Sequence, residues 1–174
     1  MNAAFASLLC LVVSLAAGNA MAVQDTATVA RAFADHCFNP RLTAATAQET
    51  LGPSGARIDF YDLDPFTDAA PSPVTGRALT QGTDRRCEVA FYGFDPQIAM
   101  EWVLTGLAQE GLTDKAAKVP ESFPLLQGNI FMAAAQLNPT RIAVVQVGIR
   151  ETAQGRQETY MNVERLTPRN EATH

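Results

Sequence analysis

The sequence predicts an α+β fold in which an antiparallel sheet of about five strands carries two or three helices on one face, with one disulfide. Short segments of alternating apolar and polar residues recur along the chain, and turn-forming residues separate them. The strongest helical segment, 96–111, directly follows the alternating run 85–92. Two cysteines remain once an N-terminal leader is removed, which suits a single pair. Helices packed on a sheet make two layers around one core.

The helix at 96–111 has signals at both ends. Asp95 can accept hydrogen bonds from the first free amides, and Pro96 loses nothing at the first helical position. Gly111 can adopt the left-handed conformation that closes a helix. Gly106 costs helix stability, so we expect another backbone to approach there. The expected apolar stripe consists of Met100, Val103, Leu104, Leu107 and Gly111.

The N-terminal part of the mature chain predicts two helices and a strand. The first helix, capped by Asp25 or Thr26, runs to about residue 38, and a weaker one spans 43–51. Alternation predicts a strand at 56–61. The proline-rich segment 63–82 reads as a long loop with a short strand at 77–80.

The C-terminal half predicts a hairpin and one more strand. Segments 128–137 and 141–150 flank the turn-forming sequence Asn138-Pro139-Thr140. Both faces of 141–150 are apolar, so this strand should be central in the sheet. Segment 158–166 alternates with polar residues, and we expect it to be an outer strand.

The N-terminus predicts export. Residues 1–22 carry no charged side chain, hold an apolar run of about 13 residues and end in small residues, as a cleaved signal peptide does. A membrane anchor is the alternative, but the run is shorter than the ~20 residues that a span needs. We expect a single domain at 23–166, a flexible tail at 167–174, a periplasmic or secreted location, and no stable membrane insertion after cleavage.

The two cysteines of the mature chain, Cys37 and Cys87, predict a disulfide, because an even pair in an exported protein is normally oxidised. The alternative is a reactive thiol at Cys37 activated by His36. Adjacent residues on a helix do not face each other, which argues against that pair.

Composition excludes several function classes. The net charge of −5 offers no basic surface, so we expect no nucleic-acid partner. The mature chain holds only His36 and His174, which leaves serine catalysis without a base and zinc short of ligands. No glycine-rich phosphate loop follows a strand. We therefore expect no cofactor.

One acidic group permits metal binding. Asp59, Asp62, Asp64 and Asp68 lie close together, and calcium prefers several carboxylate oxygens from a flexible loop. Their spacing does not match a helix-loop-helix calcium site, so a solvated strand end is the alternative interpretation.

Three further residues are candidate ligand contacts. Arg85 and Arg86 can bind a carboxylate or phosphate through their planar guanidinium groups, the alternative being a surface ion pair with Asp84 or Glu88. Trp102 would mark a binding surface if exposed, or else cover the edge of a core.

These observations favour a non-enzymatic exported module that binds an unknown protein or small-molecule ligand of the cell envelope. A carboxylate-dependent hydrolase that uses Asp62 and Asp64 is one alternative, and an accessory subunit of an envelope complex is another. The sequence contains no motif that identifies the ligand.

Overall fold

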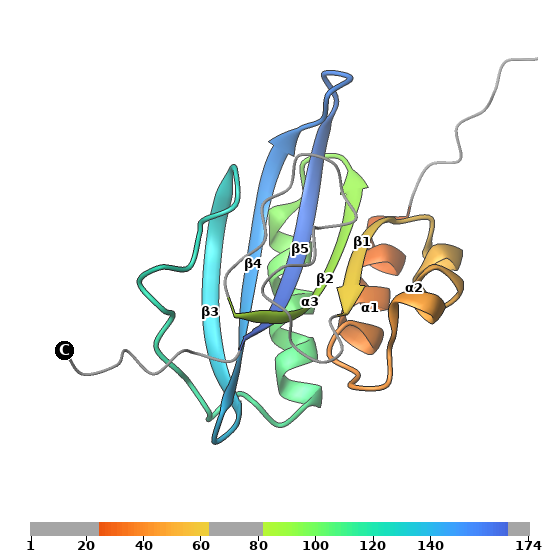
Figure 1. The fold of residues 1–174 in the computed structure, drawn as a ribbon. Coiled ribbons are helices and arrows are strands. Elements are labelled where there is room, and N and C mark those ends of the chain that lie inside the picture. The colour runs from red at the N-terminus through yellow and green to blue at the C-terminus, as the bar shows by residue number, and fades with distance from the viewer. Residues whose placement is uncertain (1–24, 63–81, 167–174) are drawn as a thin grey trace, which may run out of the picture.

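Five antiparallel strands form one sheet in the computed structural model, which describes residues 25–62 and 82–166 (Figure 1). Their order is β1-β2-β5-β4-β3, and three α-helices accompany them. The strands are β1 (Arg57–Asp62), β2 (Thr83–Tyr92), β3 (Asn129–Asn138), β4 (Arg141–Glu151) and β5 (Gln157–Leu166). The helices are α1 (Thr26–His36), α2 (Ala44–Leu51) and α3 (Pro96–Gln109), with a short 3-10 helix η1 (Gly52–Ser54). The predicted α+β fold is confirmed.

Several predictions fall on other parts of the chain. The signal peptide at 1–22, the strand at 77–80 and the tail at 167–174 lie outside the described residues. Among the helices that the structure describes, none is long and apolar enough to cross a membrane.

The helix ends follow from local chemistry. The Asp25 carboxylate accepts hydrogen bonds from the Ala27 amide at 3.2 Å and the Thr28 hydroxyl at 2.5 Å. These bonds, led by the Thr28 hydroxyl, hold the pKa of Asp25 below its usual value. Asp95 accepts from the Ile98 amide at 3.4 Å, as its position before Pro96 predicted.

The core lies between the sheet and the helices α1 and α3. Val29 and Phe33 of α1 meet Ala99 and Val103 of α3 across the middle of the sheet. The strands contribute every second side chain to this face, as alternation requires. These buried residues include Phe60, Cys87, Val89, Phe91, Val145, Val147, Met161 and Val163.

The buried stripe of α3 differs from the predicted one. Leu104 is 51% exposed, while Ala99 and Gly106 are buried. A Cβ at Gly106 would lie 3.2 Å from the Ala34 Cα and would overlap the Phe38 ring. Helix α3 turns Gly106 toward α1, because a residue without a side chain lets the two helix backbones approach closely. The close approach expected at Gly106 is therefore confirmed.

Strand β5 lies in the middle of the sheet, so its predicted outer position is wrong. It pairs with β2 on one side and with β4 on the other. Its polar side chains face away from the helices yet are almost fully buried: Glu158 is 2% exposed, and Asn162 and Glu164 are 0% exposed. Arginines of β1, β2 and β4 neutralise the two glutamates. A polar alternation can thus mark a buried ionic face as well as a solvated one.

Candidate functional site

A disulfide fixes one corner of the candidate site. Cys37, just after α1, is bonded to Cys87 in β2, with a Cα–Cα distance of 5.5 Å. The predicted pair is confirmed, and neither sulfur is a thiol in this structure. The bond holds Phe38, Asn39 and Pro40 against the end of the sheet where β2 begins.

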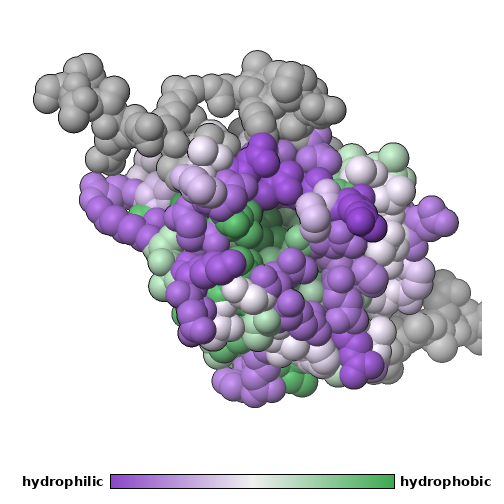
Figure 2. Space-filling model, turned by 90° about the horizontal axis from the view of Figure 1, so that it is seen from below, coloured by the Kyte–Doolittle hydropathy of each residue, from purple (hydrophilic) through white to green (hydrophobic). Residues whose placement is uncertain are grey.

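A hollow with an apolar floor opens beside this corner. Figure 2 looks at the lower end of the molecule in Figure 1 and shows a hydrophobic floor inside a hydrophilic rim. The free space at the floor is about 30 Å³, about two to three times the volume that a cavity needs to hold one water molecule. The floor is lined by Cys37, Phe38, Leu137, Ala143 and Val163.

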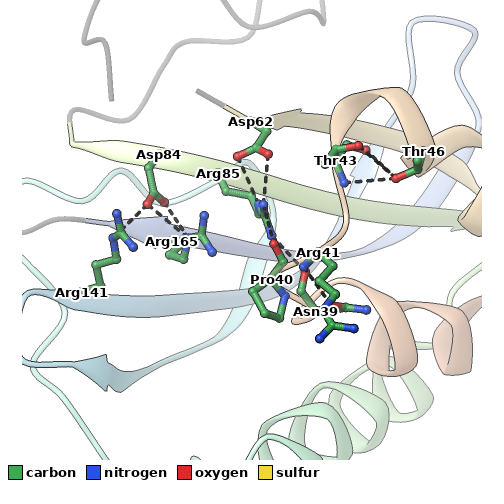
Figure 3. Close-up of polar contacts among 10 residues, drawn as sticks. All are labelled: Asn39, Pro40, Arg41, Thr43, Thr46, Asp62, Asp84, Arg85, Arg141 and Arg165. Atoms are coloured by element: carbon green, nitrogen blue, oxygen red, sulfur yellow. Dashed lines mark hydrogen bonds and ion pairs between the residues drawn. The ribbon is translucent and has the colours of Figure 1, made fainter. Parts of the chain in front are cut away.

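Arg85 forms one side of the rim and is held from several directions (Figure 3). Its Nη1 donates to the Asn39 carbonyl at 2.9 Å, and its Nη2 to the Pro40 carbonyl at 3.2 Å. Its Nη2 also lies 3.0 Å from the Asp62 carboxylate. The segment after α1 is thereby tied to the sheet through one guanidinium group as well as through the disulfide.

Asp84 binds two further arginines, Arg141 and Arg165, of which Arg165 lines the hollow (Figure 3). Its carboxylate accepts from the Arg165 Nε at 3.0 and 3.2 Å and lies 3.3 Å from the Arg141 Nε. Burial raises the pKa of Asp84, and the charges of Arg165, Arg141 and Arg85 oppose that rise. Both arginines remain partly exposed, with 22% of the Arg165 side chain and 30% of the Arg141 side chain accessible.

The rim is positively charged although the whole chain has a net charge of −5. The two charged residues that line the hollow, Arg85 and Arg165, are both arginines. With Arg141 and the two aspartates that these arginines contact, Asp62 and Asp84, they form a group of three arginines and two aspartates. The formal charge of this group is therefore one positive, beside an apolar floor.

Arg86 faces the other side of the sheet from Arg85, because successive side chains alternate. It lies 3.2 Å from Glu164 and 3.8 Å from Asp59, and its guanidinium lies 4.9 Å from the Tyr61 ring. Both arginines are buried, at 6% and 1% exposed. The surface ion pair with Asp84 or Glu88 proposed for them from the sequence is therefore wrong, since both arginines are buried, Arg85 against Asp62 and Arg86 against Glu164 and Asp59.

Asp59 and Asp62 of the predicted acidic group lie on opposite faces of the sheet. Asp59 is buried on the face turned away from the helices, and Asp62 binds Arg85 on the helix side. Asp64 and Asp68 lie outside the described residues. Within the described ranges, no group of three or more histidine, cysteine or acidic side chains is placed to hold a metal ion.

Trp102 is half-buried against the core, and the Arg31 guanidinium lies 5.3 Å from the centre of its ring. It covers an edge of the core between α1 and α3 and lines neither the hollow nor its rim.

Of the candidates from the sequence, Arg85 and Cys37 line the hollow, and Asp62 contacts Arg85. The sequence analysis missed Arg165, which lines the hollow, together with Asp84 and Arg141, which join it in one ionic group. These side chains come from three strands, and the register Arg85↔Arg165 is what brings them together. Comparison with family models, with curated proteins and with solved structures finds no match to this chain.

Proposed function

We propose that this protein is an exported, non-enzymatic binding module that holds a small organic anion in the hollow. The observation that carries the proposal is the combination of an arginine-rich rim with an apolar floor. An anion gains charge-assisted hydrogen bonds from the partly exposed guanidinium group of Arg165, with Arg141 close by on the same aspartate, while a short apolar group enters the pit.

The size of the pit limits the ligand. About 30 Å³ of free space accepts a tail of one to three carbon atoms without rearrangement of the floor. A short-chain carboxylate, or the carboxyl end of a peptide with a small side chain, fits both the charge and the volume. We take the short-chain carboxylate as the ligand class to be tested.

The rim supports binding rather than bond cleavage. Asp62 and Asp84 both have arginine partners within 3.3 Å, so each carboxylate is held as an ion-pair acceptor. Carboxylate-dependent hydrolysis at Asp62 and Asp64 remains an alternative, but no contact of Asp62 favours it. No contact among the described residues bears on the role of an envelope-complex subunit.

Calorimetric titration of the secreted protein with propionate and butyrate tests the proposal. We expect saturable binding, which Arg165→Gln weakens by roughly 10- to 100-fold through loss of a charged hydrogen bond worth about 1.5–3 kcal/mol. Arg31→Gln, a change of an exposed arginine on α1, is the matched control and should leave the affinity unchanged.

Ala143→Leu supplies a second variant, because a larger side chain on the floor fills the pit without a change of charge. It should reduce the affinity for butyrate more than that for formate. The proposed site is wrong if neither carboxylate binds saturably. It is also wrong if Arg165→Gln binds the carboxylates as tightly as the unchanged protein and the Arg31→Gln control.

A further inference from the structure

A larger cleft lies at the other end of the sheet, where β1 and β5 begin and β2 and β4 end. It encloses about 340 Å³, within the range of small-molecule sites. Its walls include Arg57, Tyr92, Arg150, Thr152 and Glu158. It shares no lining residue with the hollow, so the two can be tested separately.

Two arginines of this cleft are fixed by two buried glutamates. Glu158 accepts from the Arg57 Nε at 2.8 Å and the Arg150 Nε at 2.6 Å. Glu88 lies 3.4 Å from the Arg57 Nη2 and also accepts from the Arg150 Nη2. The guanidinium of Arg150 lies 4.7 Å from the centre of the Tyr160 ring.

The glutamates lie deeper than the arginines. Glu88 and Glu158 are at most 2% exposed, whereas 37% of the Arg57 side chain and 15% of the Arg150 side chain are accessible. Planar donors of fixed orientation therefore face the cleft, and little rotamer entropy is lost when a ligand binds them.

The two arginines and two glutamates at this cleft carry no net formal charge. An anion would have to compete with buried carboxylates for the arginines, and a cation would meet two guanidinium groups first. A neutral ligand that exchanges hydrogen bonds with planar groups avoids both costs.

The remaining walls suit such a ligand. Tyr92 is 40% exposed and offers an aromatic surface, while Arg156 lies over its ring and is not among the residues that line the cleft. Thr152 belongs to a closed turn, in which its amide donates to the Arg156 carbonyl at 2.8 Å and its own carbonyl accepts from the Gly155 amide at 2.9 Å. This turn closes one end of the cleft, so that arginine donors and an aromatic ring border one volume.

We infer that this cleft is a second ligand site and that it binds a neutral polyhydroxylated molecule of monosaccharide to disaccharide size. Hydroxyl groups of the ligand bond to Arg57 and Arg150, and its apolar C–H surface packs on Tyr92. The inference does not depend on the anion site, and it would give the protein two ligands at the two ends of one sheet.

Titration of the labelled, secreted protein with glucose, galactose, N-acetylglucosamine and maltose, followed by amide NMR, tests the inference. At least one sugar should bind saturably in the millimolar range and shift the amides of Tyr92, Thr152 and Glu158. Tyr92→Ala should weaken that binding about five-fold through loss of the aromatic contact. Phe94→Ala is the matched control, because Phe94 is 69% exposed, lies two residues away and does not line the cleft.

The outcomes separate the two sites. Arg165→Gln should leave sugar binding unchanged, even though it weakens the binding of carboxylates at the hollow. The inference is overturned if no sugar saturates the protein, if Tyr92→Ala and Phe94→Ala have equal effects, or if gluconate binds this cleft while every neutral sugar fails.

Discussion

Gly106 offers a direct test of how α1 and α3 pack, because a methyl group there has no space. In Gly106→Ala the new Cβ would lie 2.9 Å from the Phe38 Cδ2 and 3.2 Å from the Ala34 Cα. The first distance is shorter than carbon atoms tolerate, so the Phe38 ring must move. The second asks the α1 backbone to shift by a few tenths of an ångström.

Two opposing terms set the size of the effect. Alanine in place of glycine inside a helix gains about 1 kcal/mol. Overpacking of a close contact costs about 1–3 kcal/mol. We expect a net loss of about 1 kcal/mol in the free energy of unfolding, or about 3 °C in Tm for a domain of this size.

Urea unfolding followed by circular dichroism measures this loss, and a double-mutant cycle with Phe38→Leu identifies its cause. The smaller side chain removes the ring that the methyl group meets, so Gly106→Ala should be neutral or stabilising in that background. If Gly106→Ala stabilises the unchanged protein by about 1 kcal/mol, as at an exposed helical position, the packing described here is wrong.

Three further perturbations follow from single contacts. Replacement of both Cys37 and Cys87 by alanine should lower the free energy of unfolding by about 4 kcal/mol, because the bond closes a loop of 50 residues, and chemical denaturation of the oxidised and replaced proteins measures it. Burial raises the pKa of Tyr61 from 10.0 to about 12, so the folded phenol stays protonated while the unfolded one ionises, and stability is lost as pH rises from 10 to 12. In Tyr61→Phe, the fall in the free energy of unfolding between pH 10 and 12 should be smaller by up to about 3 kcal/mol. An equally steep fall in the variant would contradict the raised pKa of Tyr61. Gly148→Ala places a Cβ 2.5 Å from the Tyr160 Cζ, so we expect at least about 2 kcal/mol of destabilisation in thermal unfolding, and an unchanged Tm would contradict it.

Much of the fold could be predicted because its signals are local. The caps at Asp25 and Asp95, the hairpin around Asn138 and the alternation of 85–92 each depend on residues a few positions apart. The Cys37–Cys87 bond spans 50 residues, yet it was predictable because residues 23–174 hold a single pair of cysteines.

Predictions failed where the burial of a side chain depends on residues that are distant in the sequence. The alternation in β5 is the same for a solvated face as for one in which Glu164 meets Arg86, 78 residues away. Only the order of the strands distinguishes the two cases. Leu104 was expected in the core because its spacing fits, but the close contact at Gly106 turns α3 and leaves Leu104 exposed.

The candidate site could be predicted only in part for the same reason. Arg85 stands out in the sequence beside Arg86, but the sequence does not show that the two lie on opposite faces with different partners. Asp84, Arg141 and Arg165 meet through the register of three strands, and no short motif connects them.

An NMR titration with butyrate tests the central claim most directly, because amide shifts report where the ligand sits. We expect saturable shifts at Arg85, Ala143 and Arg165, around the arginine rim and its apolar floor, and none at Thr152 or Glu158 at the far end of the sheet. Shifts confined to the far end, or none at saturating butyrate, would contradict the claim that the hollow binds a small organic anion.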